Sequence, residues 1–263
     1  MNLSRLSGGK KMVEFVGAGC GAADLITLRG KRLIEEADVI IYAGSLVNPE
    51  LLAYAKSDCE IYNSALMHLD EVIEIMKKAE VSGKTTVRLH TGDPCVYGAV
   101  REQMDRLEEL GIEYSVTPGV SSFCGAAAAL RAEYTLPDVS QTVILTRMAG
   151  RTPVPERESI ESLAAHHATM VIFLSTGMLD ELAKQLIAGG YSADTPAAIV
   201  YKATWSDEKI VRCTVGKLAE EAQKNSISKT ALITVGDFLG DDYELSKLYD
   251  KHFETGFRKA ENV

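Results

Sequence analysis

Residues 85–99, which read TTVRLHTGDPCVYGA, constrain the fold of this chain more than any other stretch. The first five residues are mostly β-branched or apolar, which predicts a strand over 85–89. Gly92 permits a positive φ and Pro94 fixes its own φ, so we expect a tight loop and then a helix over 96–110. In open α/β sheets, ligands bind at polar loops that follow buried strands. A plain turn between strand and helix would use the same glycine and proline, so both interpretations stay open here.

Strand and helix patterns alternate along the first half with short connections, which predicts a mostly parallel sheet with helices on both faces. We expect a helix over 25–37 with Asp24 as its cap, and an amphipathic helix over 68–82. The second half predicts another α/β domain. The expected organisation is a disordered leader (1–11), an N-terminal α/β domain (12–133), a hinge (134–140), a C-terminal α/β domain (141–240) and a charged tail (241–263) in which a helix is one interpretation.

Composition excludes several functional classes. Apolar residues make up 46% of the chain, charged residues 25%, and the net charge of −9 argues against nucleic acid or an anionic membrane surface as the main partner. No apolar run could span a bilayer and the N-terminus has no signal-peptide pattern, so a cytoplasmic location is expected.

The five cysteines form no CxxC pair, and the adjacent His166 and His167 cannot chelate together from one helix. We therefore expect no metal site.

The first glycine loop matches a dinucleotide-binding fingerprint only in part. Gly17, Gly19 and Ala22 satisfy G-x-G-x-x-G/A between a predicted strand and helix. The fingerprint also needs an acid at the end of the second strand, over 39–43, to bind the ribose. Asp38 lies before that strand, at its wrong end, which disfavours a nicotinamide-dependent oxidoreductase. A tight turn used only for packing is the other interpretation of this loop.

Four further loops follow predicted strands and carry small and hydroxyl-bearing residues. They lie at 91–93, 121–122, 175–177 and 203–204. Such a lining suits a mixed polar and apolar cofactor, such as an adenosyl compound, better than a triphosphate. Taken singly, each serine or threonine is equally explained as a helix N-cap.

Charged and titratable side chains near these loops are candidates for substrate contact. A bidentate guanidinium suits a polycarboxylate, and the alternative is a solvated surface cation. Four cations are candidates for holding carboxylates: Arg101, Arg147, Arg151 and Lys202. His90 and Tyr97 flank the central loop and are the catalytic candidates, able to transfer a proton or orient a substrate. The alternative for each is a partly buried polar side chain that hydrogen-bonds the backbone.

Three loop motifs together resemble the tetrapyrrole methylase family, whose members use S-adenosyl-L-methionine. They are VGAGCG at 16–21 followed by DLIT at 24–27, HTGDP at 90–94, and PGVSS at 118–122. The resemblance runs over about 12–240. Later stretches, QTVILTR at 141–147, GRTPVPE at 150–156 and YKATW at 201–205, resemble the precorrin-4 C-11 methyltransferases of cobalamin synthesis, a branch of that family.

The resemblance implies two α/β domains with the cofactor in the interdomain cleft, a small tetrapyrrole substrate, and a homodimer. Carried across motif by motif, it assigns cofactor contacts to Cys20, Thr91, Gly92, Asp93, Val96, Ser121, Ser122, Leu174, Ala203, Thr230 and Ala231. The first loop departs from the usual GAGPGDP, because Cys20 replaces the proline and Ala22-Ala23 replace Asp-Pro. The family's loop borders the tetrapyrrole, so the substrate contacts of this loop stay open.

The implied reaction is methylation of C-11 of precorrin-4 or its cobalt form, by in-line attack of a ring carbon on the sulfonium methyl group. The main contribution of the protein would be alignment in a dry cleft. Three alternatives stay open: another C-methyltransferase of the same pathway, a non-catalytic tetrapyrrole carrier, and an NAD(P)-binding oxidoreductase.

Overall fold

The computed structural model describes residues 12–261, so the expected leader lies outside the described residues. The contacts within the chain divide it into two units. The first contains the chain up to Ala126 together with Ala203–Asp207, and the second contains Ala127–Lys202 and the chain from Glu208 onward. This division falls inside helix α4 (Ser122–Leu130), whereas the sequence predicts a hinge over 134–140. The predicted domain limits stay a prediction.

The first unit is built on a parallel five-stranded sheet in the order β3-β2-β4-β1-β5. Its strands are β1 (Val13–Gly17), β2 (Val39–Tyr42), β3 (Glu60–Asn63), β4 (Thr86–His90) and β5 (Tyr114–Thr117). Strand β4 is central and buried along its whole length, although it carries Arg88 and His90. Gly17 pairs with His90 and Val16 with Thr117, so the carboxyl ends of β1, β4 and β5 meet at one edge of the sheet. The loops of the three motifs therefore leave the sheet side by side.

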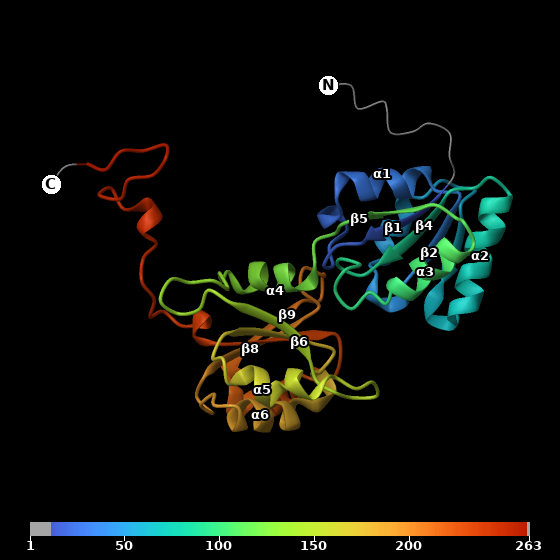
Figure 1. Ribbon diagram of the computed structural model, residues 1–263. Helices are drawn as coiled ribbons and strands as arrows, with labels where there is room; N and C mark the ends of the chain where they lie inside the picture. The colour runs from blue at the N-terminus through green and yellow to red at the C-terminus, as the bar shows by residue number, and fades with distance from the viewer. Residues whose placement is uncertain (1–11, 262–263) are drawn as a thin grey trace. The chain divides into compact units, whose positions relative to one another are not determined.

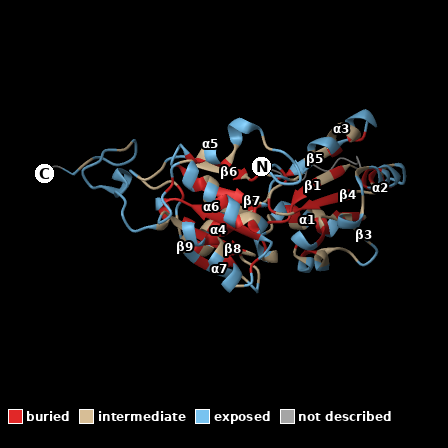
Figure 2. Cartoon of the chain, turned by 90° about the horizontal axis from the view of Figure 1, so that it is seen from below, coloured by how far each residue is buried: buried red, intermediate tan, exposed pale blue. Residues whose placement is uncertain are grey.

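Both faces of this sheet are covered by helices (Figure 1). Helices α2 (Leu69–Val81) and α3 (Arg101–Glu109) pack on one face, where Phe15, Met76 and Leu107 are buried together. Helix α1 (Leu28–Glu36) and a 3-10 helix (Pro49–Tyr54) pack on the other, where Ile34, Leu51 and Leu89 share a second cluster. In Figure 2 the inner strands β1 and β4 are largely buried, while the outer faces of the helices are exposed.

Two helices of the first unit start later than the sequence predicts. Helix α1 begins after Thr27, whose hydroxyl accepts a hydrogen bond from the Gly30 amide at 3.0 Å, while Asp24 lies in a separate 3-10 turn. Asp24 is therefore not the cap. Helix α3 begins at Arg101 instead of residue 96, because Tyr97 (φ 55°) and Ala99 (φ 48°) adopt left-handed backbone that cannot continue a right-handed helix.

The second unit contains a mixed sheet in the order β6-β7-β10-β8-β9. Its strands are β6 (Val143–Arg147), β7 (Thr169–Phe173), β8 (Pro196–Tyr201), β9 (Lys209–Thr214) and β10 (Ala231–Val235). Only β6 and β7 run parallel, and the other neighbours are antiparallel. Helices α5 (Ile160–Ala164), α6 (Leu179–Ala188) and α7 (Leu218–Lys224) bury their apolar sides with Ile172 and Ile233. The expected class, an α/β fold with mostly parallel or mixed sheets, is confirmed.

The charged tail contains no α-helix in its described part. From residue 241 onward the only regular element before residue 262 is a 3-10 turn at Lys247–Tyr249, so the helical interpretation is wrong. Leu245, Tyr249 and Phe257 are exposed there, and apolar side chains without a packing surface cannot stabilise a helix. No helix within residues 12–261 is long and apolar enough to cross a membrane.

Candidate functional site

The first glycine loop and the HTGDP loop are joined through their backbones at the carboxyl edge of the first sheet. The Ala18 amide donates to the His90 carbonyl at 2.7 Å, which extends the pairing of β1 with β4. Beyond it, Gly19 and Gly92 form an isolated antiparallel bridge, with N···O distances of 3.2 and 2.9 Å. The two loops therefore form one unit of structure.

Three glycines allow the third motif to join them. A Cβ built on Gly17 would lie 2.6 Å from the Gly119 Cα and 2.6 Å from the Gly92 carbonyl oxygen. A Cβ on Gly119 would lie 2.2 Å from that same oxygen. Contacts this short exclude any side chain, so the close approach that the glycine loop predicts is an approach to other backbone.

Asp93 fastens this arrangement with its carboxylate. One oxygen accepts from the Cys95 amide at 2.8 Å and the other from the Gly119 amide at 2.9 Å. Partial burial raises the pKa of this carboxyl, but the hydrogen bonds from Cys95 and Gly119 outweigh it, and the pKa lies below its ordinary value. Asp93 therefore stays ionised at neutral pH and ties the second loop to the third.

The segment Ala203–Asp207 packs onto the first glycine loop, although it is far away in sequence. The Thr204 hydroxyl accepts from the Ala22 amide at 3.0 Å and lies 3.6 Å from the Cys20 sulfur. A Cβ on Gly21 would lie 2.4 Å from the Ala203 carbonyl oxygen. The structure thus brings Cys20 and Ala203, two of the expected cofactor contacts, to the same part of the first unit.

Neither catalytic candidate has the geometry of an obvious proton carrier. His90 is 4% exposed and stacks on Phe15 with ring centroids 6.1 Å apart. Burial, helped by the charge of Arg88, lowers its pKa to about 3, so the ring is neutral at pH 7. Tyr97 is 44% exposed on left-handed backbone. Their catalytic roles stay predictions, and the burial of His90 does not favour its role as a base.

The four candidate cations differ in what they contact. Arg101 is on α3 in the first unit, and its Nε donates to Asp105 at 2.7 Å. Arg147 donates to three backbone carbonyls, of residues 148, 152 and 153, at 2.8–3.2 Å, and so braces the exposed loop that carries Arg151. The Lys202 ammonium lies 5.4 Å from the centre of the Tyr201 ring. The carbonyl contacts of Arg147 do not prevent its guanidinium from also binding a carboxylate. Substrate contact stays a prediction for all four cations.

Strained residues mark one edge of the sheet in the second unit. Leu174, Lys202 and Thr230 follow β7, follow β8 and precede β10, with φ values of 53°, 46° and 58°. Because β10 is antiparallel to both neighbours, these three positions lie at the same edge, where the Lys202 amide donates to the Thr230 carbonyl at 3.1 Å. Such backbone costs about 1–2 kcal/mol per residue and often accompanies function. Leu174, Thr230 and the adjoining Ala231 are expected cofactor contacts.

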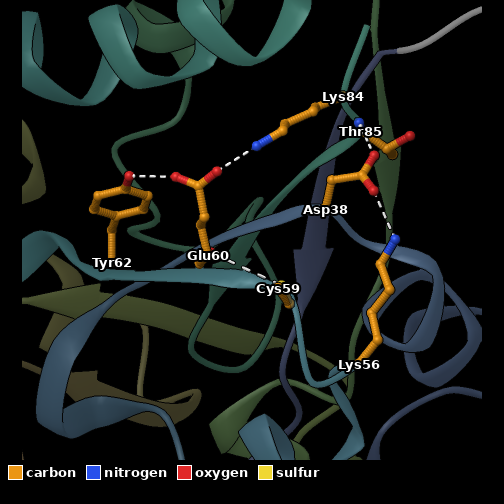
Figure 3. Close-up of polar contacts among 7 residues, drawn as sticks. All are labelled: Asp38, Lys56, Cys59, Glu60, Tyr62, Lys84 and Thr85. Atoms are coloured by element: carbon orange, nitrogen blue, oxygen red, sulfur yellow. Dashed lines mark hydrogen bonds and ion pairs between the residues drawn. The ribbon is translucent and has the colours of Figure 1, made fainter. Parts of the chain in front are cut away.

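Asp38 cannot serve as the ribose acid of a dinucleotide site. Its carboxylate accepts from Lys56 at 2.6 Å and from the Thr85 amide at 2.7 Å, beside a second group formed by Glu60, Tyr62 and Lys84 (Figure 3). All of this lies at the amino edge of the sheet, opposite the motif loops. The fingerprint is therefore incomplete in three dimensions as well as in sequence.

Sequence analysis did not single out the buried arginine of β4. Arg88 is 6% exposed and donates to the Gln103 side chain on α3. The sequence does contain a signal for this residue, because a cation in the middle of a predicted buried strand needs a hydrogen-bonding partner. Within residues 12–261, no group of three or more His, Cys, Asp or Glu side chains is placed to hold a metal ion.

Comparison with known proteins identifies the family. A model of the tetrapyrrole (corrin/porphyrin) methylases matches residues 12–219, most of the chain and all three motif loops. The chain belongs to the tetrapyrrole methylase family, as the loop motifs predict.

Individual relatives agree with this over nearly the full length. A cobalt-precorrin-4 C(11)-methyltransferase of Methanocaldococcus jannaschii is 57% identical over 251 residues, 95% of this chain and 97% of the relative. A crystal structure of a cobalt precorrin-4 methyltransferase, a cobalamin biosynthetic enzyme, superimposes with a TM-score of 0.86 at 47% identity, covering 88% of this chain and 96% of that one. A uroporphyrin-III C-methyltransferase from Thermus thermophilus, solved with S-adenosylhomocysteine, has a TM-score of 0.71 at 25% identity, covering 87% of this chain and 93% of that one.

Proposed function

We propose that this chain is an S-adenosylmethionine-dependent methyltransferase that methylates C-11 of cobalt-precorrin-4 in cobalamin biosynthesis. The observation that carries the proposal is the full-length identity of 57% to a relative with that activity. The later motifs at 141–147, 150–156 and 201–205 support the same branch of the family. The alternative of an NAD(P)-dependent oxidoreductase had only the glycine loop in its favour, and Asp38 is engaged elsewhere.

The residues of the first unit suit S-adenosylmethionine. The Thr91 hydroxyl is buried without a hydrogen-bond partner among the described residues, which leaves it available to a polar group of the cofactor. The small residues Gly92, Ser121 and Ser122 line the junction of the second and third loops, where a Cβ on Gly92 would already lie 3.3 Å from the Ser122 amide. These residues, with Cys20, Asp93, Val96 and Ala203, hold the cofactor in this proposal. Leu174, Thr230 and Ala231 of the second unit contribute to its binding.

When bound, S-adenosylmethionine supplies an electrophilic methyl group on a sulfonium centre. The protein binds and orients the cofactor and the tetrapyrrole and excludes water from them. Little acid catalysis is needed, because the thioether that leaves the sulfonium centre is a good leaving group. The joined loops give a rigid support for this, because Asp93 and the glycine contacts fix three segments together. Arg147, Arg151, Lys202 and Arg101 bind the peripheral carboxylates of the tetrapyrrole. Neither His90 nor Tyr97 is assigned as a base.

Calorimetry of the purified chain with S-adenosylhomocysteine, with NAD in a parallel titration, tests the cofactor. We expect one-site binding of the homocysteine compound and no heat from NAD. Binding of NAD without binding of the homocysteine compound would refute the proposal that the chain is a methyltransferase. Incubation with S-adenosylmethionine and either cobalt-precorrin-4 or metal-free precorrin-4, followed by mass spectrometry, then tests the reaction. Tetrapyrrole binding without methylation would instead support the carrier alternative.

We also infer a homodimer, because the family resemblance implies one. Light scattering during size-exclusion chromatography should give twice the mass of 28.5 kDa. A monomer at micromolar concentration would contradict this part of the proposal and leave the reaction untouched. The cytoplasmic location expected from the sequence stays a prediction, which fractionation of the source cells tests.

A further inference from the structure

Arg88 places a positive charge inside the first unit without a negative partner. Its Nε donates to the Gln103 side-chain oxygen at 3.0 Å and its Nη1 to the Ile41 carbonyl at 3.1 Å. No carboxylate within residues 12–261 forms an ion pair with it. Burial lowers its pKa to about 10, so the guanidinium remains charged at neutral pH. A buried charge held only by neutral oxygens is costly, which suggests a use beyond packing.

Gln103 also forms a hydrogen bond with the loop that precedes its helix. It is 6% exposed on α3, and its side-chain nitrogen donates to the Ala99 carbonyl at 2.9 Å. Because a guanidinium only donates, Arg88 holds the amide oxygen of Gln103 toward itself and the NH2 group toward Ala99. The two residues thus connect the centre of β4 to the loop backbone in one defined orientation.

The loop that receives this hydrogen bond is strained. Between Pro94 and Arg101, both Tyr97 and Ala99 have positive φ, and a Cβ on Gly98 would lie 2.2 Å from the Pro94 carbonyl oxygen. Left-handed backbone at non-glycine residues persists only where surrounding contacts hold it. Asp93 fastens the beginning of this loop through the Cys95 amide, and Gln103 fastens its end. Val96, an expected cofactor contact, lies between the two.

We propose that Arg88 and Gln103 are positioning residues for the methyl-transfer reaction, which hold residues 94–100 in the conformation that binds cofactor and tetrapyrrole. This inference rests on the proposed function. Neither side chain is a catalytic residue, because both act through the Ala99 carbonyl. A purely structural role would instead make their loss lower stability and binding together.

Gln103→Glu separates the two roles. The carboxylate still accepts from Arg88, and now neutralises it, but it cannot donate to the Ala99 carbonyl and repels it. We expect the thermal midpoint to stay within a few degrees of wild type, while the Kd for S-adenosylhomocysteine rises about tenfold, because the loop loses the hydrogen bond that holds its Ala99 carbonyl. Amide hydrogen exchange in residues 95–100 should become faster without ligand, while β1, β4 and β5 remain protected.

Two further variants complete the test. Gln103→Met removes both hydrogen bonds and should lower the thermal midpoint as well as the affinity, because Arg88 then loses a partner. Glu102→Gln changes an exposed neighbour on the same helix and should leave stability, exchange and affinity at wild-type values. With cobalt-precorrin-4, we expect Gln103→Glu to raise KM for S-adenosylmethionine more than it lowers kcat.

Each outcome has a definite meaning. Wild-type affinity and wild-type exchange in Gln103→Glu would overturn the positioning role, as would a loss of affinity that appears only with faster exchange throughout the first sheet. Failure of the wild-type chain to bind S-adenosylhomocysteine would overturn the proposed function instead. Exchange in residues 95–100, measured without ligand, would then still decide whether Gln103 holds the loop.

Discussion

The two units hold their candidate site residues in different ways. In the first, Gly17, Gly92 and Gly119 bring backbone against backbone, and a carboxylate ties the loops together. In the second, Leu174 and Thr230 keep their side chains on left-handed backbone at a sheet edge. The first arrangement permits no added atom at these three glycines. The second stores strain but leaves room for substitution, so the first unit should tolerate mutation far less well.

Gly119→Ala should have the largest effect. The new Cβ would lie 2.2 Å from the Gly92 carbonyl oxygen and 2.7 Å from the Gly17 Cα. Because both of these are backbone atoms, the loops must separate. We expect a loss of about 3 kcal/mol of unfolding free energy and no measurable binding of S-adenosylhomocysteine. Denaturant unfolding measures the first quantity and calorimetry the second. Gly256→Ala is the matched control in the second unit, since a Cβ there meets no atom within 4 Å and residue 256 lies in none of the candidate loops. Equal behaviour of the two variants would remove the contrast.

Asp93→Asn should have the next largest effect, because Asn offers one neutral oxygen to the two N–H donors, Cys95 and Gly119, and its NH2 group faces the other donor without accepting from it. We expect a loss of about 1–3 kcal/mol at pH 7. The folded-state pKa of Asp93 is lowered, so its stabilisation is complete above the ordinary pKa of about 3.9 and is lost as pH falls through the folded value. The stability difference between wild type and variant should therefore shrink from pH 6 to pH 3. The exposed Asp58→Asn is the control, and a difference independent of pH would contradict the assignment.

Arg147 tests whether a residue of the second unit is specific to the substrate. We expect Arg147→Ala to weaken tetrapyrrole binding about tenfold while the Kd for S-adenosylhomocysteine changes less than about twofold. Arg147→Lys keeps the charge but loses the planar group that reaches three carbonyls, so it should fall between wild type and alanine. Fluorescence titration with the tetrapyrrole and calorimetry with the cofactor product give the two affinities. Equal losses in both would mean that Arg147 only supports its loop.

Leu174 should give the smallest change in stability. Leu174→Gly relieves the positive φ but adds freedom to the unfolded chain, so we expect unfolding free energy within about 1 kcal/mol of wild type. Leu174→Ala keeps the strain and removes the same exposed side chain. If the side chain contacts the cofactor, both variants should weaken S-adenosylhomocysteine binding to a similar extent. A stability loss as large as that of Gly119→Ala would contradict the proposed tolerance of this edge.

The order of strands and helices could be predicted from the sequence because it depends on local patterns. Apolar and β-branched runs identified β2 and β4, and the spacing of apolar residues identified α2. The local backbone geometry of the loops could not be predicted from these patterns. The sequence predicts a helix from residue 96, yet Tyr97 and Ala99 are left-handed. The Ala99 carbonyl accepts from the Gln103 side chain, a contact that no propensity scale contains.

The candidate site was predictable in position and not in detail. Motifs placed Asp93 and Gly119 in neighbouring loops, because parallel strands end at one edge. That the carboxylate of one binds the amide of the other depends on strand order, which the motifs do not state. The charge of Arg88 within β4 is visible in the sequence, but its pairing with Gln103 depends on how α3 packs on the sheet, which the sequence pattern does not state. The cofactor and substrate contacts of individual residues stay predictions.

The contact among Gly17, Gly92 and Gly119 also determines how this site can be altered by selection. A damaging substitution in a packed core is usually suppressed by a second one that makes a neighbouring side chain smaller. Here each of the three residues already has no side chain, and the obstructing atoms belong to the main chain. A screen for suppressors of Gly119→Ala should therefore recover revertants, or changes that move whole loops, and no compensating substitution at the other two glycines.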